Sequence, residues 1–255
     1  MIEKRIIPCL DTKDGRLVKG TNFVNLVDIG DPIEYAKMYE KQGASEIVFL
    51  DITATNEKRD TRIELVKRGA EAVNIPIAIG GGIKSIEDIR RILNSGASKV
   101  SINSAAVKNP KLIEEACCEF GKERIVIAID GGKDEAGKFT VRISGGEEDT
   151  GLDIVEWAKE CERLGAGEIL LTSLDRDGTK AGYDIEMTKA VSENVSIPVI
   201  ASGGCGNISD IVEVFQETNC DAALVASLLH YEDSTIDKIK EELGKNQINV
   251  RGKKE

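Results

Sequence analysis

The chain repeats its own segments, in the same order and at a nearly constant spacing. Ile75 and Ile197 begin two copies of nearly one phrase, 122 positions apart, and three further pairs follow the same order. The pairs are IPIAIGGGI (75–83) with IPVIASGGCG (197–206), GASEIVFLDITAT (43–55) with GAGEILLTSLDRDGT (165–179), RIIPCLD (5–11) with RIVIAID (124–130), and GASKVSINSAAV (96–107) with NCDAALVASLLH (219–230). Ordered matches of this kind predict two similar halves, roughly 1–120 and 121–255.

Eight short apolar runs alternate with amphipathic helical patterns along the chain. They lie near 5–10, 47–51, 76–80, 99–103, 125–130, 169–173, 198–202 and 222–227. Continuous apolar runs are typical of parallel strands that are covered on both faces. Eight alternating β and α units in two similar halves predict a (β/α)8 TIM barrel with two-fold half-barrel internal duplication, forming a single domain over 1–255. A doubly wound open sheet is the rival, but a repeated half fits it less well.

Composition excludes several classes of function. The net charge of −11 and the pI near 4.9 argue against a nucleic-acid surface. Six cysteines without a CxxC pair, together with one histidine, argue against a metal site or a disulfide framework and favour a cytoplasmic location. No apolar run approaches the roughly 18 residues of a membrane helix, and the first residues do not resemble an export signal.

The strand ends carry two matched glycine-rich phrases. Barrel chemistry lies at the carboxyl ends of strands, and two of the following loops, 11–30 and 131–152, are long; the second contains KFTVRISGG, a possible hairpin. GGGI follows the third strand and SGGCG the seventh, where backbone N–H groups can approach an anion. The fourth strand adds Asn103 and Ser104, and the eighth adds Ala226 and Ser227. We expect two opposed phosphate cups and a ligand with a phosphate at each end; tight turns alone are the alternative.

Asp11 and Asp130 occupy equivalent positions at the ends of the first and fifth strands. A carboxylate at the mouth of an apolar barrel can have its pKa tuned for proton transfer, so the two are candidates for an acid and a base. The alternative is a pair of helix caps or loop anchors. His230 is expected to be structural. Cys205 is expected to fill its loop, although a nucleophile remains the other reading.

Four charged residues stand at the opposite ends of the strands. They are Arg5, Glu46, Lys99 and Glu168. Arg5 shares the strand alternation of Asp11, and Lys99 shares that of Asn103, so the charges should face inward. We therefore expect a salt-bridged ring at the barrel floor, with a solvated rim as the alternative.

These residues together resemble a known family, the cyclase subunit of imidazole glycerol phosphate synthase, over essentially the whole chain. The segments that carry the resemblance are RIIPCLDTKDGRLVKGTNF, VFLDITAT, GGGI, KVSINSAAV, AIDGG, GAGEILLTSLDRDGTKAGYD, IASGGCG and INVRG. The resemblance implies conversion of a bisphosphorylated ribulosyl formimino-AICAR intermediate (PRFAR) and ammonia into imidazole glycerol phosphate and AICAR, in histidine biosynthesis. It implies no cofactor and no metal, and a glutaminase subunit that docks beneath the barrel and delivers the ammonia.

The resemblance also assigns roles to residues. Asp11 and Asp130 would be the catalytic acid–base pair, Lys19 the lysine of a mobile first loop, and the four floor charges a gate for ammonia. Phosphate contacts fall on Gly82, Asn103, Ser104, Thr172, Asp177, Gly178, Ser202, Gly203, Gly204, Ala226 and Ser227. Two glycines follow Asp130 where the family is expected to carry a small residue and then a basic one, and Lys133 is the candidate substitute.

Two other functions remain open at this stage. A sister isomerase of the same pathway would also use two strand-end aspartates, but the first loop resembles the cyclase, and a charged floor has no purpose without ammonia. A non-catalytic barrel that senses a sugar phosphate would need neither Asp11 nor Asp130.

Overall fold

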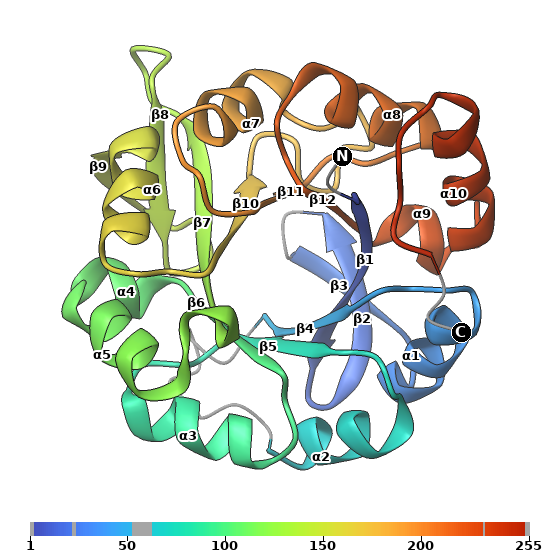
Figure 1. Cartoon of the computed structure of the whole chain (residues 1–255), viewed down its shortest axis with the longest axis horizontal. Coiled ribbons are helices and arrows are strands. Elements are labelled where there is room, and N and C mark those ends of the chain that lie inside the picture. The colour runs from blue at the N-terminus through green and yellow to red at the C-terminus, as the bar shows by residue number, and fades with distance from the viewer. Residues whose placement is uncertain (1–2, 22–23, 53–62, 232, 253–255) are drawn as a thin grey trace.

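The computed structural model describes residues 3–21, 24–52, 63–231 and 233–252. In this part of the chain, eight parallel strands form a closed ring with helices around it (Figure 1). In ring order they are β1 (Arg5–Lys13), β4 (Ile47–Asp51), β5 (Ile77–Gly80), β6 (Lys99–Ile102), β7 (Ile125–Lys133), β10 (Glu168–Ser173), β11 (Val199–Ser202) and β12 (Ala222–Val225). Pairing of β12 with β1 closes the ring, so the predicted (β/α)8 barrel is confirmed.

The helices cover the outside of the ring. Their bounds are α1 (Pro32–Lys41), α2 (Ile63–Ala72), α3 (Ile86–Asn94), α4 (Ser104–Lys108), α5 (Lys111–Phe120), η1 (Lys122–Arg124), α6 (Ile154–Arg163), α7 (Ile185–Ser192), α8 (Ile208–Glu217), α9 (Ser227–His230) and α10 (Ile236–Lys245). Asp31 and Asp153, 122 positions apart, cap α1 and α6 by accepting hydrogen bonds from the first-turn N–H groups of Ile33 and Val155. The first helix of each half therefore begins in the same way.

The internal repeat is visible in the hydrogen bonds of the barrel. The bond from Ile47 N to Pro76 O, at 3.0 Å, recurs as the bond from Ile169 N to Pro198 O, at 2.9 Å. Both pairs differ by the 122 positions of the sequence repeat. This match means that equivalent strands of the two half-barrels pair in the same register, in addition to having similar residues.

The two long loops form antiparallel strands. The hairpin predicted within 131–152 is present as β8 (Phe139–Ile143) and β9 (Glu148–Asp153), with β8 paired to an extension of β7. The segment 11–30, expected as a loop, is instead largely β2 (Arg16–Thr21) and β3 (Val24–Gly30), with β2 paired to an extension of β1. The reason is the turn at Asp14 and Gly15, whose φ angles of 53° and 75° suit a two-residue hairpin connection.

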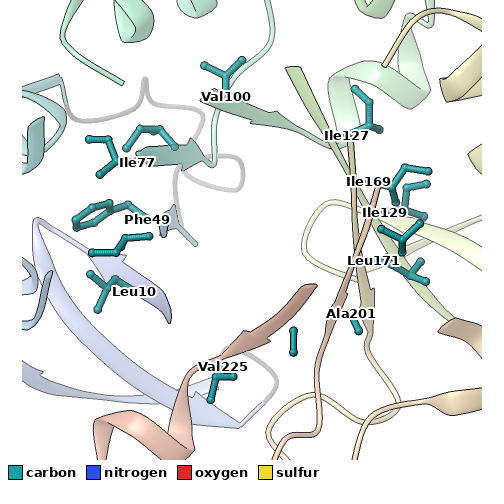
Figure 2. Packing of buried hydrophobic residues seen from close by; sticks show 14 of the residues in the cluster. Leu10, Phe49, Ile77, Val100, Ile127, Ile129, Ile169, Leu171, Ala201 and Val225 are labelled. Atoms are coloured by element: carbon teal, nitrogen blue, oxygen red, sulfur yellow. The ribbon is translucent and has the colours of Figure 1, made fainter. Parts of the chain in front are cut away.

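Buried apolar side chains form two separate clusters. The larger one fills the space between the strands and the helices, and Figure 2 labels several of its strand members, from Leu10 and Phe49 to Val225. The smaller one lies inside the barrel, where alternate residues of each strand point inward. Its buried members are Ile7, Cys9, Val48, Ala78, Val126, Leu170, Ile200, Ala222 and Leu224. The barrel interior is therefore a packed apolar layer between the two ends of the strands.

Gly167 provides a test of the packing at the start of β10. A Cβ placed there would lie 1.9 Å from the carbonyl oxygen of Lys122, so Gly167→Ala should lower the free energy of unfolding by at least about 2 kcal/mol. Gly244→Ala is the control, because a Cβ at this exposed helical position meets nothing within 4 Å. It should raise stability by up to about 0.5–1 kcal/mol. Urea unfolding would measure both, and equal stabilities would contradict the close contact.

Candidate active site

A cavity of about 510 Å³ opens at the carboxyl ends of the barrel strands. This volume is within the range of small-molecule sites, roughly 300–1,000 Å³. Every residue that the sequence assigned to catalysis or to phosphate binding lines it. These residues are Asp11, Lys19, Gly82, Asn103, Ser104, Asp130, Thr172, Asp177, Gly178, Ser202, Gly203, Gly204, Ala226 and Ser227. The barrel thus brings together residues from almost the whole chain.

Asp11 and Asp130 come from opposite walls of this cavity. β1 and β7 are separated by three strands in either direction around the ring. Both aspartates lie inside long strands, at the level where the barrel ladder ends: Asp11 is paired in register with Leu50, and Asp130 with Thr172. Beyond this level each strand continues into its hairpin. Each carboxylate therefore lies within a strand that continues past it, and not at a strand end as the sequence suggested.

Asp11 is buried and held by two neighbours. The Nζ of Lys19, on β2, lies 3.3 Å from Oδ2, and the Cys9 thiol lies 3.4 Å from Oδ1 as a hydrogen-bond donor. Burial by itself would lower the pKa of Lys19, but the carboxylates of Asp11 and Asp177 raise it. Lys19 is therefore an ammonium group between two acids. Burial raises the pKa of Asp177, an effect that Lys19 opposes and Asp11 reinforces.

Asp130 has a different environment. Its Oδ2 accepts a hydrogen bond of 2.8 Å from Nδ2 of Asn103, a neutral amide, where Asp11 has the ammonium group of Lys19. Burial raises the pKa of Asp130 to about 6; the hydrogen bonds from Asn103 and Thr172 oppose this rise, and the charge of Asp177 adds to it. A carboxyl group with this pKa can both give and take a proton near neutral pH.

The expected phosphate cup with the phrase SGGCG, which we call the second cup, lies at the ends of β11 and β12. Gly203 and Gly204 have φ angles of +91° and +98°, and a Cβ on Gly203 would lie 2.6 Å from the carbonyl oxygen of Ser173. Only glycine fits this close approach of two backbone segments. The approach places Asp177 and Gly178, in the segment after β10, on the cavity beside Ala226 and Ser227.

The cup with the phrase GGGI, which we call the first cup, lies at the ends of β5 and β6. It repeats this construction 122 positions earlier. Gly81 has a φ angle of +97°, and a Cβ there would lie 2.1 Å from the carbonyl oxygen of Asp51, the counterpart of Ser173. Ser104 Oγ accepts a hydrogen bond of 3.0 Å from the N–H of Ser144, in the turn between β8 and β9. Through this contact the hairpin brings Gly145 onto the cavity.

Several lining residues were not identified from the sequence. They include Asp51, Lys84, Lys108, Gly145 and Lys180. Lys84 and Lys108 directly follow the two phrases of the first cup, so proximity to GGGI and INSAAV was an available signal. Gly145 belongs to the predicted hairpin, but its place on the cavity depends on the contact of Ser144 with Ser104, which no pattern in the sequence indicated.

The four charges at the other end of the strands form the expected ring, which we call the floor ring. Arg5 pairs with Glu46 at 3.3 Å and with Glu168. Lys99 pairs with the same two carboxylates at 3.0 and 2.8 Å. Each acid therefore contacts both bases, and the buried charges compensate one another. The alternative of a solvated rim is excluded, since Arg5, Glu46 and Glu168 are buried.

The structure also shows the surroundings of three further residues that the sequence singled out: His230, Cys205 and Lys133. His230 is buried with both ring nitrogens in hydrogen bonds, and burial lowers its pKa to about 4, as expected of a structural histidine. Cys205 lines the cavity, but burial raises its pKa to about 12, which disfavours a nucleophile. The Nζ of Lys133 pairs with Glu186 at 2.8 Å, and Lys133 is not among the residues that line the cavity.

The described ranges contain no group of three or more His, Cys, Asp or Glu side chains placed to hold a metal ion. They also contain no helix long and apolar enough to cross a membrane.

Comparison with known proteins gives one consistent result. Residues 5–235 match the family model described as "Histidine biosynthesis protein". The chain is 62% identical over 252 residues to imidazole glycerol phosphate synthase subunit HisF of Lactococcus lactis subsp. cremoris (strain SK11), covering 98% of this chain and 97% of the relative. It is 57% identical over 271 residues to the subunit of the same name from Methanococcus vannielii, covering 98% of this chain and all of the relative.

The raised pKa of Asp130 predicts a cost in stability. Between pH 4 and 6 the folded chain binds a proton at Asp130 more tightly than the unfolded chain, so this group makes the free energy of unfolding fall as pH rises. At about 1.4 kcal/mol per pH unit, the cost above pH 6 is on the order of 1–3 kcal/mol. Asp130→Asn should therefore be more stable than the unmodified chain at pH 7.5, and the gain should vanish near pH 4.

Urea unfolding at both pH values would test this prediction. Glu135→Gln, at an exposed loop residue, is the control for a lost negative charge. An Asp130→Asn variant that is no more stable than the unmodified chain at pH 7.5 would mean that the carboxylate is not strained by burial.

The floor ring yields a second stability prediction. Arg5→Met would leave Glu46 and Glu168 buried with one cation between them, at a cost of about 3–5 kcal/mol. Arg163→Met, which removes an exposed pair with Glu160, should leave the denaturation midpoint unchanged. Similar midpoints for the two variants would show that the floor ring is not an interdependent set.

Proposed function

We propose that this chain, which belongs to the family of histidine biosynthesis proteins and matches its HisF members over nearly its whole length, is the cyclase subunit of imidazole glycerol phosphate synthase. It is an enzyme of histidine biosynthesis. The observation that carries the proposal for its site is one cavity with two glycine-built cups, two opposed aspartates between them and a charged ring at the far end of the barrel.

The substrate in this proposal is PRFAR, which has a phosphate at each end. Each phosphate would bind in one cup, where positive-φ glycines let backbone N–H groups approach it. Lys84 and Lys108 add positive charge around the first cup and Lys180 near the second. Held at both ends, the substrate would place its reacting atoms between the two aspartates.

The reaction needs proton transfers and no change of oxidation state. Ammonia adds to the ribulosyl carbonyl and water leaves; ring closure then breaks a C–N bond and releases AICAR, leaving imidazole glycerol phosphate. Asp11, in its ion pair with Lys19, is suited to accept protons as the base. Asp130, with a pKa near 6, is suited to supply a proton to the departing water or amine and to recover one afterwards.

The name of the relatives describes a subunit, so the chain works with a partner subunit. We propose that this partner is a glutaminase, that it docks below the floor ring, and that ammonia passes between the ring and the cavity through the barrel. The support is that Arg5 and Lys99 share ion pairs at the floor ring, at the opposite end of the apolar interior from the cavity.

The catalytic unit in this proposal is the whole barrel acting as one domain. The first cup belongs to one half and the second cup to the other, while the pair of aspartates draws one member from each. A cytoplasmic location is supported by the free state of all six cysteines, which a reducing compartment would preserve.

Turnover of PRFAR with ammonium salt at alkaline pH tests the activity without the partner. Asp11→Asn and Asp130→Asn should each lower kcat at least about 100-fold, because each removes a proton-transfer group. Both variants should still bind the substrate, as calorimetry would measure, since the cups are untouched.

Glu135→Gln should keep the full rate. Substrate binding without turnover by the unmodified chain would favour a sugar-phosphate sensor instead. Absence of binding would reject the assignment of both cups.

A further inference from the structure

The only histidine of the chain has a role that the proposed reaction does not use. His230 is the last residue of α9, the helix whose first residue, Ser227, lines the second cup. Its Nε2 lies 2.8 Å from the carbonyl oxygen of Cys9, and its Nδ1 lies 2.6 Å from the hydroxyl of Tyr39. A carbonyl can only accept, so Nε2 carries the proton and Nδ1 accepts from Tyr39. The tautomer is fixed by two buried partners.

The carbonyl of Cys9 needs the His230 imidazole as a hydrogen-bond donor, because the neighbouring strand β12 ends before it reaches this level. The ladder between β1 and β12 stops at Pro8 and Val225, where β12 ends. One position further along β1, the imidazole takes the place of the missing strand as a donor. Cys9 also donates its thiol to Asp11, so the residue that His230 holds through its backbone contacts the catalytic carboxylate through its side chain.

Two tyrosines of α1 extend these contacts to the strand of Lys19. Tyr39 is fully buried beside His230. The ring of Tyr35 stands edge-on to His230 at 5.9 Å, and its hydroxyl donates to the carbonyl of Ile29 at 3.2 Å. Ile29 lies near the end of β3, which pairs with β2, the strand that carries Lys19.

We propose that Tyr35, Tyr39 and His230 form a positioning cluster that keeps three parts of the active site in fixed relation: the Asp11 strand, the Lys19 hairpin and the second cup. None of the three residues lines the cavity. Its function is to maintain the Asp11–Lys19 pair at a constant place relative to the bound phosphate, so that base and substrate meet in one geometry. The low pKa of His230 agrees with this function, because an imidazole that stays neutral keeps both hydrogen bonds.

The single histidine makes the geometry directly measurable. With ¹⁵N-labelled histidine, the full chain should give one imidazole, in the Nε2–H tautomer, that does not titrate between pH 5.5 and 9. Tyr39→Phe removes the donor to Nδ1 and should change the tautomer ratio or permit titration. An imidazole that titrates near pH 6.5 in the unmodified chain, or one indifferent to Tyr39→Phe, would overturn the proposal.

Inorganic phosphate provides a readout that does not depend on the proposed reaction. Saturation of the cups should shift the His230 resonances, because α9 joins the second cup to the imidazole, and Tyr39→Phe should weaken that shift. The absence of any shift with phosphate bound would overturn the coupling between the cup and the cluster, whatever the reaction is.

Steady-state kinetics can distinguish a positioning role of the cluster from a contribution to stability alone. This test rests on the proposed function, because it measures turnover of PRFAR. Tyr39→Phe should lower kcat about 10-fold with little change in the KM for PRFAR. Thr218→Val is the control, because it removes a different buried hydroxyl, one that donates to the carbonyl of Val214 away from the cavity. It should keep kcat within 2-fold.

Equal kcat values for the two variants would make the cluster a packing feature only. A loss of kcat in His230→Ala that His230→Gln partly restores would support the donor to Cys9 as the important bond, since glutamine also carries an N–H. Failure of the unmodified chain to turn over PRFAR would reject the proposed function, and the two spectroscopic results would still decide the role of the cluster.

Discussion

One geometrical constraint places the floor ring, the apolar layer and Asp11 inside this barrel: the alternation of side chains along strands that close into a ring. On β1 alone, Arg5, Ile7, Cys9 and Asp11 all point inward, two positions apart. One strand therefore contributes to the floor ring, to the apolar layer and to the active site in turn. A slip of one residue in its pairing would turn all four outward, so the register of the ladder specifies the function together with the fold.

The two halves share a scaffold and differ in what they add to it. Both first strands continue into an antiparallel hairpin, but β2 carries Lys19 to Asp11, whereas the turn after β8 approaches Ser104. Equivalent aspartates consequently have different neighbours, an ammonium group in one case and the amide of Asn103 in the other. This difference in neighbours is how two residues at the same position of a repeat can come to divide the roles of base and acid.

The sequence alone predicts the barrel, its strand ends and the floor ring, because repeats, apolar runs and alternation are local patterns. The resemblance to a family singled out Lys19 as a residue of the first loop, but its place beside Asp11 follows from the Asp14–Gly15 turn, which folds β2 back along β1. The contact of Tyr39 with His230 joins residues 191 positions apart, and no local pattern indicates such a pair. The pKa of Asp130 is likewise a product of burial, which depends on what the whole fold places around it.

The apolar layer between the floor ring and the cavity is also a dielectric barrier. Ile7, Val48, Leu170 and Ile200 have no polar side-chain atoms to replace the hydration shell of an ion, and desolvating an ion costs several kcal/mol. A small neutral molecule incurs far less of that penalty. If ammonia crosses this layer as proposed, an ammonium ion would have to leave its proton on the floor side before its nitrogen could reach Asp11.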